Sequence, residues 1–182
     1  MSLVKEQVNN VFDSLKDAFG YKNKLQAPRV EKVVVNVGTG KRAKLDRHWN
    51  DFVAERLGKI TGQKAATRGA KKSIAGFKIR QGDPIGQTVT LRGPRMYHFL
   101  DKLVHIALPR TKDFRGLKRT SIDAMGNMTL GIKEHTIFPE TSDEELKDIF
   151  GLSITVTTTA RNKEEATKLF EHLGFPLKKE EE

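Results

Sequence analysis

Residues 152–159 read Leu-Ser-Ile-Thr-Val-Thr-Thr-Thr, and this stretch is the clearest indication of the fold class. Apolar and hydroxyl-bearing side chains alternate along it. That is the pattern of a β-strand with one face on a core and the other face exposed. The side chains expected to point inward are Leu152, Ile154 and Val156, and those expected to point outward are Ser153, Thr155, Thr157 and Thr159.

Two earlier segments repeat this two-faced pattern. Residues 30–37 place Glu31, Val33, Val35 and Val37 on one face and Lys32, Val34 and Asn36 on the other. Residues 87–92 place Val89 and Leu91 toward a core, and Thr88, Thr90 and Arg92 outward. The outward faces share small polar and basic side chains, so we predict an antiparallel sheet with one open face.

Amphipathic segments and capping residues predict the helices. They span residues 3–19, 46–60 (from an Asp46 cap to Gly62), 94–109 (from Pro94 to Pro109), 143–150 (short and acidic) and 162–174 (with an Asn162-x-x-Glu165 cap). A hairpin is expected over 121–132, with Gly126-Asn127 at its tip. The sum is a single α+β domain over residues 1–177, with helices on one face of the sheet and an open polar, basic face. A disordered acidic tail is expected over 178–182.

Positive charge is concentrated in the first two-thirds of the chain. Residues 1–118 hold 25 Lys and Arg against 10 Asp and Glu, a net charge of +15 in a chain whose overall net charge is +10. The remaining residues, 119–182, are therefore net negative, at −5. Between Arg56 and Gly82 there are eight bases and no acid. This distribution favours a polyanionic partner such as RNA over simply solvated charges.

Other classes of function find little support. The chain has no cysteine, which excludes disulfides and cysteine-bound zinc. His98 and His105 stand about two helical turns apart, about 10 Å, too far to share one metal ion. The Gly38-Thr39-Gly40-Lys41 turn fits neither glycine-rich nucleotide motif, and no catalytic constellation stands out. No apolar run is long enough to span a membrane. We therefore expect no enzyme activity, no cofactor, no metal and no membrane partner.

The segment from Lys71 to Gly82 combines bases, glycines and one aromatic residue. Cations can contact phosphates and Phe77 can stack on a base, which suits a loop that reaches into RNA. An ordinary hairpin with solvated lysines fits the composition equally well.

The chain resembles the family of universal large-subunit ribosomal protein five, in its bacterial form, from about residue 5 to 177. The segments that carry this resemblance occur in family order and spacing: Ala27–Lys32, Val35–Gly38, Thr61–Lys64, Lys71–Arg80, Pro84–Gly86, Val89–Gly93, Leu108–Arg110, Asp113–Gly116, Leu130–Glu134, Ile137–Glu140 and Thr157–Ala160.

The resemblance implies a non-enzymatic role on cytoplasmic ribosomes, in the central protuberance of the large subunit. It implies contacts with 5S rRNA at Asn36, Gln63 and Thr90, and we add the outward-facing Lys32 and Arg92. It also implies that the loop reaches peptidyl-site tRNA, with Lys71, Lys72, Ser73, Phe77, Lys78 and Arg80 as candidates. Further implied partners are 23S rRNA, small-subunit head protein thirteen and other central-protuberance proteins.

One segment departs from the family. The usual Phe-Asp-Gly-Arg-Gly-Asn-Tyr hairpin is replaced by Ile122-Asp123-Ala124-Met125-Gly126-Asn127-Met128, which lacks an arginine and two aromatic residues. The contact that this hairpin makes is therefore expected to be altered. A non-ribosomal RNA-binding module is the alternative reading, because it would share the charge, although not the ordered segments.

Overall fold

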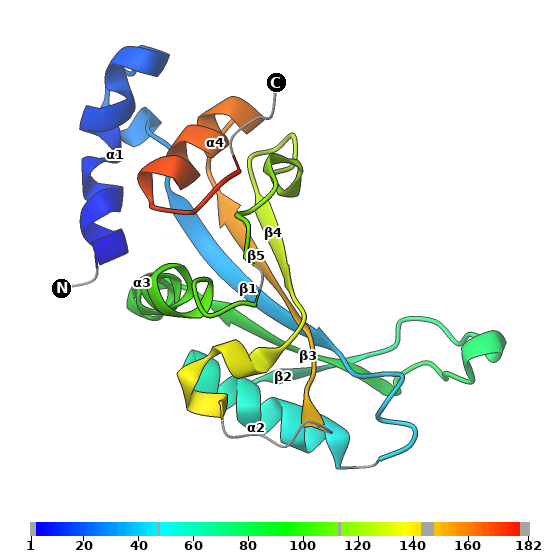
Figure 1. Cartoon of the computed structure of the whole chain (residues 1–182). Coiled ribbons are helices and arrows are strands. Elements are labelled where there is room, and N and C mark those ends of the chain that lie inside the picture. Colours follow the sequence, from blue (N-terminus) through cyan, green and yellow to red (C-terminus); the bar gives the residue numbers. More distant parts are fainter. Residues whose placement is uncertain (1–2, 47, 113, 143–147, 179–182) are drawn as a thin grey trace. The chain divides into compact units, whose positions relative to one another are not determined.

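The computed structural model describes residues 3–46, 48–112, 114–142 and 148–178. Their main helices are α1 (Leu3–Phe19), α2 (Trp49–Thr61), α3 (Gly93–Lys102) and α4 (Lys163–His172). Their strands are β1 (Val30–Gly38), β2 (Ala66–Gly69), β3 (Pro84–Leu91), β4 (Met128–Ile132) and β5 (Leu152–Thr158). The strands form one antiparallel sheet in the order β2-β3-β1-β5-β4 (Figure 1), which confirms the predicted α+β class.

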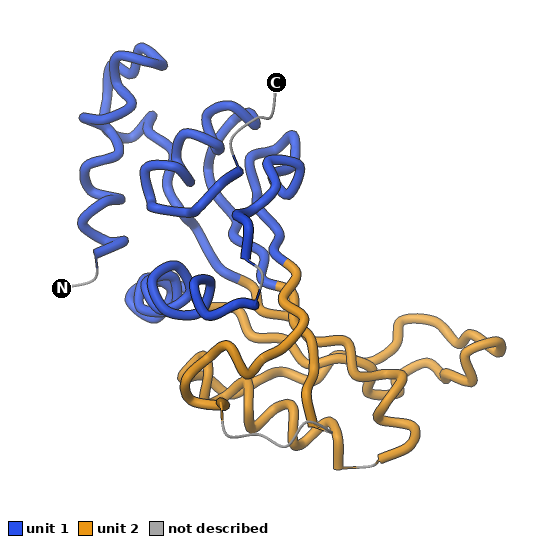
Figure 2. The backbone as a smooth tube through the Cα atoms, in the orientation of Figure 1, with its two compact units in different colours: residues 1–33, 92–130, 154–182 blue, residues 34–91, 131–153 orange. Residues whose placement is uncertain are grey.

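The chain divides into two compact units (Figure 2). One unit contains residues 1–33, 92–130 and 154–182, and the other contains residues 34–91 and 131–153. The single domain over residues 1–177 stays a prediction. The expected disordered tail lies outside the described residues, apart from Lys178.

The first unit packs three helices together. Helix α1 contacts both α3 and α4, and it buries Val4, Val11 and Leu15. Its first turn is held by the backbone N–H of Val4, which donates to Asp101 Oδ1 at 2.8 Å. Helix α4 begins as predicted, with Asn162 Oδ1 accepting the N–H of Glu165 at 2.9 Å.

The predicted hairpin over 121–132 is only partly formed. Gly126 stands at the tip with a φ of +78°, as expected of a tight turn. The returning arm is strand β4, whereas the other arm pairs only through a single bridge between Ile122 and Met128. Asp123 accounts for this geometry, since its carboxylate accepts the N–H groups of Met125 and Asn127 and so builds a side-chain turn instead of a ladder.

The predicted helix over 94–109 changes character near its end. Pro94 stands in the first turn as expected, and the regular part, α3, ends at Lys102. A wider π-type turn follows from Leu103 to Ala107, with the N–H of Leu108 donating to Leu103 O at 2.9 Å. The periodicity therefore located the helix correctly but could not show the change of winding.

The second unit packs α2 against β3 and β2. Val53, Leu57 and Ile60 of α2 are buried, and the helix ends at Gly62 with a φ of +67°, as predicted. Its predicted start at Asp46 was wrong. Asp46 Oδ1 instead accepts the N–H of His48 within a separate turn, so the helix begins only at Trp49.

Thr88 was expected to point to solvent, but it is buried, because its hydroxyl donates to Val35 O on the neighbouring strand at 3.2 Å. The expected exposure of Thr88 was therefore wrong, although Thr88 still alternates with Val89 along β3. Most of the acidic helix expected over 143–150 lies outside the described residues.

Candidate RNA-binding surface

In the second unit, one face of β1 and β3 is packed and the other is polar. The N–H of Thr39 donates to Ile85 O at 2.8 Å, which sets these antiparallel strands with Thr39 opposite Ile85. Continued along the strands in two-residue steps, this register puts Val35 and Val37 on the same face as Val89, and all three are buried. Asn36 belongs to the opposite face and is exposed, as the alternation predicted.

Gln63 and Thr90 are brought together by a hydrogen bond. Gln63 follows the Gly62 cap of α2, and its Nε2 donates to the backbone oxygen of Thr90 at 3.1 Å. The hydroxyl of Thr61 donates to Leu57 O at 2.6 Å and accepts the N–H of Gln63 at 3.4 Å, which fixes the turn between the helix and Gln63. Both Gln63 and Thr90 remain half-buried.

Asn36 lies on the strand next to β3 and has a fixed backbone. The hydroxyl of Ser153 on β5 donates to Asn36 O at 3.3 Å, and the side-chain amide of Asn36 is exposed. The exposed amide can both donate and accept, so it suits base edges and ribose hydroxyls. The predicted trio therefore consists of one bonded pair, Gln63 and Thr90, together with a separate exposed amide.

Lys32 and Arg92 belong to the first unit. Arg92 Nη1 lies 3.5 Å from Glu31 Oε1, and both side chains are at least half exposed, at 58% and 50%. An exposed ion pair of this kind contributes little to stability, so Arg92 can exchange Glu31 for another anion. Lys32 is half-buried on β1. Sequence reasoning did not anticipate that Glu31 pairs with Arg92.

The Lys71–Gly82 segment forms an arm between β2 and β3 that extends away from the strands of the second unit (Figure 1). Ile74 and Ile79 pair through two backbone hydrogen bonds, at 2.9 and 3.2 Å, and the N–H of Gln81 donates to Ser73 Oγ at 2.9 Å. The arm is therefore an internally bonded hairpin.

The exposed side chains of the arm suit contact with nucleic acid. Phe77 stands on the helical turn at the tip and is 67% exposed. The predicted polar and basic residues of the arm are also exposed, namely Lys71, Lys72, Ser73, Lys78 and Arg80. An exposed aromatic ring among cations can stack on a base while the cations contact phosphates.

The described residues hold neither a metal-binding cluster nor a membrane-spanning helix. No group of three or more His, Asp or Glu side chains in these ranges could hold a metal ion. Within the same ranges, every helix is too short or too polar to cross a bilayer.

The fold and surface define a class: an α+β protein whose antiparallel sheet has one polar face and carries a basic arm. The family described as "Ribosomal protein L5" matches residues 23–80, and the family described as the C-terminus of that same ribosomal protein family matches residues 84–177. The chain belongs to the ribosomal protein L5 family. It is therefore a ribosomal protein of the cytoplasm and not an enzyme.

Three relatives cover almost the whole chain, and each carries the name "Large ribosomal subunit protein uL5". The protein from Natranaerobius thermophilus is 48% identical over 96% of this chain and 97% of its own length. The one from Trichlorobacter lovleyi is 49% identical over 93% and 94%, respectively. The one from Flavobacterium johnsoniae is 47% identical over 97% and 96%.

Proposed function

We propose that this chain, a structural constituent of the large ribosomal subunit, binds 5S rRNA through the polar face of its sheet. Three relatives named as large-subunit proteins, each aligned over more than nine-tenths of its own length, support the placement in that subunit. The net charge of +10 fits a polyanionic partner.

The observation that carries the RNA contact is the exposed amide of Asn36 on a strand whose opposite face is packed. A strand fixed by a core holds a recognition group more precisely than a loop does. Gln63 and Thr90 form a second polar contact site for RNA. The hydrogen bond from Gln63 Nε2 to Thr90 O holds the two residues together there. Lys32 and Arg92 supply cations for phosphates, which position an RNA without reading its sequence.

The arm has a different role in this proposal. Its tip residues, including Phe77, contact peptidyl-site tRNA, while the sheet contacts 5S rRNA. The proposed assembly also includes 23S rRNA, other proteins of the central protuberance and protein thirteen of the small-subunit head. These partners follow from the family resemblance and from the exposed bases of the arm.

A non-ribosomal RNA-binding module would share the charge and the polar face. It would not explain why similarity to large-subunit proteins extends over almost their whole length. The ribosomal role is therefore the better supported of the two.

The test is to incubate the purified, RNA-free protein with total bacterial RNA and to sequence what it retains. The proposal expects 5S rRNA to be strongly enriched, and expects Asn36→Ala to reduce that enrichment. Asn10→Ala is the matched control, since it makes the same change at an exposed position on α1. Enrichment of unrelated RNAs in place of 5S rRNA would contradict the proposal.

A further inference from the structure

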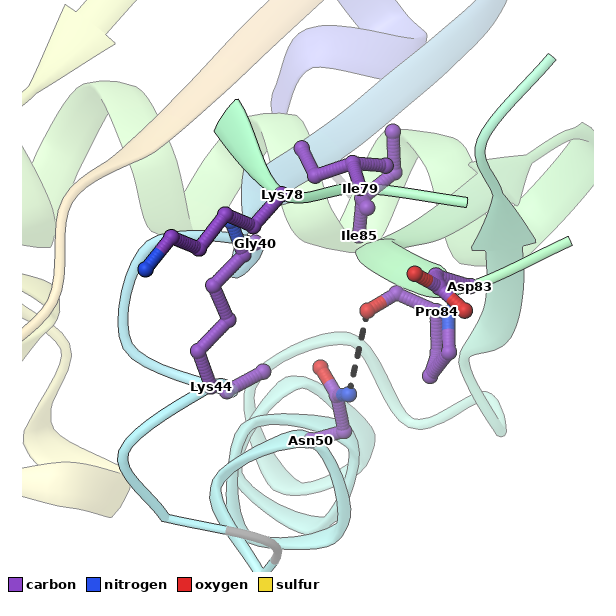
Figure 3. A pocket seen from close by; sticks show the side chains of 9 residues that line it. Gly40, Lys44, Asn50, Lys78, Ile79, Asp83, Pro84 and Ile85 are labelled. Atoms are coloured by element: carbon purple, nitrogen blue, oxygen red, sulfur yellow. Dashed lines mark hydrogen bonds between the residues drawn. The ribbon is translucent and has the colours of Figure 1, made fainter. Parts of the chain in front are cut away.

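A hollow of about 230 Å³ lies between the arm and the loop after β1, within the second unit. Three segments form its wall: the loop after β1 with Gly40 and Lys44, the start of α2 with Asn50, and the chain from Lys78 in the arm to Ile85 at the start of β3. Figure 3 shows the side chains of Lys44 and Lys78 on the same side of this hollow, near Gly40. Two cations from distant parts of the sequence thus share one concave site.

The loop that carries Lys44 is anchored on its N-terminal side, at Thr39 and Arg42. Thr39 donates its N–H to Ile85 O at 2.8 Å and its hydroxyl to Asn50 Oδ1. Arg42 stacks its guanidinium 4.0 Å from the centre of the Trp49 ring and donates to Ile149 O at 3.1 Å. Lys44 therefore lies within a hydrogen-bonded turn, since Leu45 and Asp46 donate their N–H groups to Arg42 O, and its own side chain is exposed.

Lys78 has an unusual backbone. Its φ is +50°, and among the described residues it is the only non-glycine residue with a positive φ. Side chains other than glycine rarely adopt this left-handed conformation, and where they do, a functional reason is worth testing. The conformation ends the short helical turn at the arm's tip, and the Lys78 side chain lines the hollow.

The polar groups of the hollow favour an anion near the lysines. Neither Lys44 nor Lys78 forms an ion pair with another described residue. The amide of Asn50 is occupied, since it accepts from Thr39 and its Nδ2 donates to Pro84 O at 3.4 Å. Asp83 lies on the side of the hollow away from the lysines in Figure 3, and its Oδ2 accepts the N–H of Arg80 at 2.7 Å.

The geometry points to a phosphate-binding site in this hollow, held by Lys44 and Lys78 and occupied by a phosphate group of an RNA backbone. Lysine suits this role because its ammonium group can meet a phosphate from many directions. Because Lys44 is on the β1 loop and Lys78 is on the arm, a phosphate bound by both links the arm to that loop. The assignment of the bound phosphate to RNA rests on the proposed function, whereas the affinity of the hollow for phosphate does not.

The first experiment uses inorganic phosphate and the full-length protein. Backbone amide shifts of Ala43, Lys44 and Ile79 are followed by NMR during a phosphate titration at constant ionic strength. Saturable shifts are expected in the wild type and in Lys41→Gln, the control on the same loop outside the hollow. Affinity should fall at least tenfold in Lys44→Gln and in Lys78→Gly, where glycine tolerates the positive φ and so protects the fold.

Shifts that do not saturate, or that persist unchanged in both variants, would overturn the phosphate site.

The second experiment measures the affinity of the protein for 5S rRNA as a function of salt concentration. Lys44→Gln should make the slope of log affinity against log salt less steep than in the wild type, by the amount that corresponds to one lost phosphate contact. Lys163→Gln on α4 should leave the slope unchanged. An unchanged slope in Lys44→Gln, beside lost phosphate binding, would overturn 5S rRNA as the source of the phosphate. Failure of the wild type to bind 5S rRNA would overturn the proposed function and that source together, and the phosphate titration would still decide whether the hollow binds phosphate.

Discussion

Gln63 Nε2 donates a hydrogen bond to the backbone oxygen of Thr90 at 3.1 Å, across 27 positions of sequence. The bond joins the turn after α2 to strand β3, next to the polar face that carries Asn36. It gives Gln63 a structural contact in addition to any contact with RNA. Asn36, whose amide is exposed, is consequently the cleaner probe of RNA recognition.

Substitution of the polar face should therefore separate recognition from stability. Asn36→Ala and Thr90→Ala are expected to weaken 5S rRNA binding by about 1–3 kcal/mol each while leaving the melting temperature unchanged. Gln63→Ala should weaken binding and also lose about 0.5–1.5 kcal/mol of unfolding free energy, because its bond to Thr90 O is lost. Binding titrations and thermal melts measure the two effects, with Asn10→Ala as control. Wild-type binding by all three variants would show that this face is not the recognition surface.

Substitutions in the arm should weaken the binding of tRNA and leave the binding of 5S rRNA unchanged. Combined replacement of Lys71, Lys72 and Arg80 by Ala removes three exposed cations and keeps Lys78, which lines the hollow. Each lost cation is expected to remove on the order of 1 kcal/mol or less of attraction to RNA. The variant should form the 5S complex and enter ribosomes that hold peptidyl-site tRNA less firmly. Filter binding of tRNA to purified ribosomes measures this, and loss of the 5S complex instead would reverse the assignment.

The altered hairpin gives a sharp stability prediction at Gly126. Its φ is +78°, and a Cβ there would lie 2.7 Å from the Cβ of Ala160. Gly126→Ala should therefore lower the unfolding free energy by about 2–4 kcal/mol, from backbone strain and overlap together. Gly131→Ala is the control, since a Cβ there meets nothing within 4 Å. Equal denaturation midpoints for the two variants would contradict this account of the hairpin.

A buried histidine should make stability depend on pH. His135 is fully buried, its ring stacks 4.0 Å from that of Phe150, and its Nδ1 accepts the Phe150 N–H at 3.3 Å. Burial holds the pKa of His135 below its ordinary value, with a smaller contribution from the positive charge of Arg56. A lowered pKa means that the folded state favours the neutral ring, so the unfolded chain takes up the proton first as the pH falls.

Unfolding free energy should accordingly be highest above a pH of about 6.5 and fall below it, by up to about 1.4 kcal/mol per pH unit, until the folded-state pKa is reached. His135→Phe keeps an aromatic ring beside Phe150 and should flatten this dependence, although it loses the acceptor for the Phe150 N–H. His98→Gln changes an exposed histidine and should keep the wild-type dependence. Urea denaturation between about pH 7 and 5.5 measures the slope. Equal slopes in the wild type and His135→Phe would exclude this histidine as the cause.

Alternation along strands and helical periodicity predicted most of the fold. They located α1, β1, α4 and β5, because each of these elements carries a full apolar face. They failed where a local side-chain bond overrides the pattern. Asp46 builds its own turn in place of a helix cap, and the Thr88 hydroxyl bonds to the next strand instead of to solvent.

The sequence predicted which residues belong to the candidate site, but not how these residues contact one another. Alternation placed Asn36 correctly, yet no local pattern shows that Gln63 bonds to Thr90 or that Arg92 pairs with Glu31. The hollow was missed for the same reason. Lys44 and Lys78 are 34 positions apart in the sequence, and only the folded chain brings them to the same hollow. The run of bases in the loop after β1 was the sequence signal available.

The most direct test of the central claim is the affinity for 5S rRNA, measured from about 50 to 200 mM salt beside an unrelated structured RNA of equal length. Binding through phosphate contacts and a specific polar face predicts tighter binding of 5S rRNA at every salt concentration. It also predicts a log–log slope of about −0.7 to −0.9 for each phosphate contact. Equal affinity for the two RNAs, or an affinity that does not change with salt, would contradict the account.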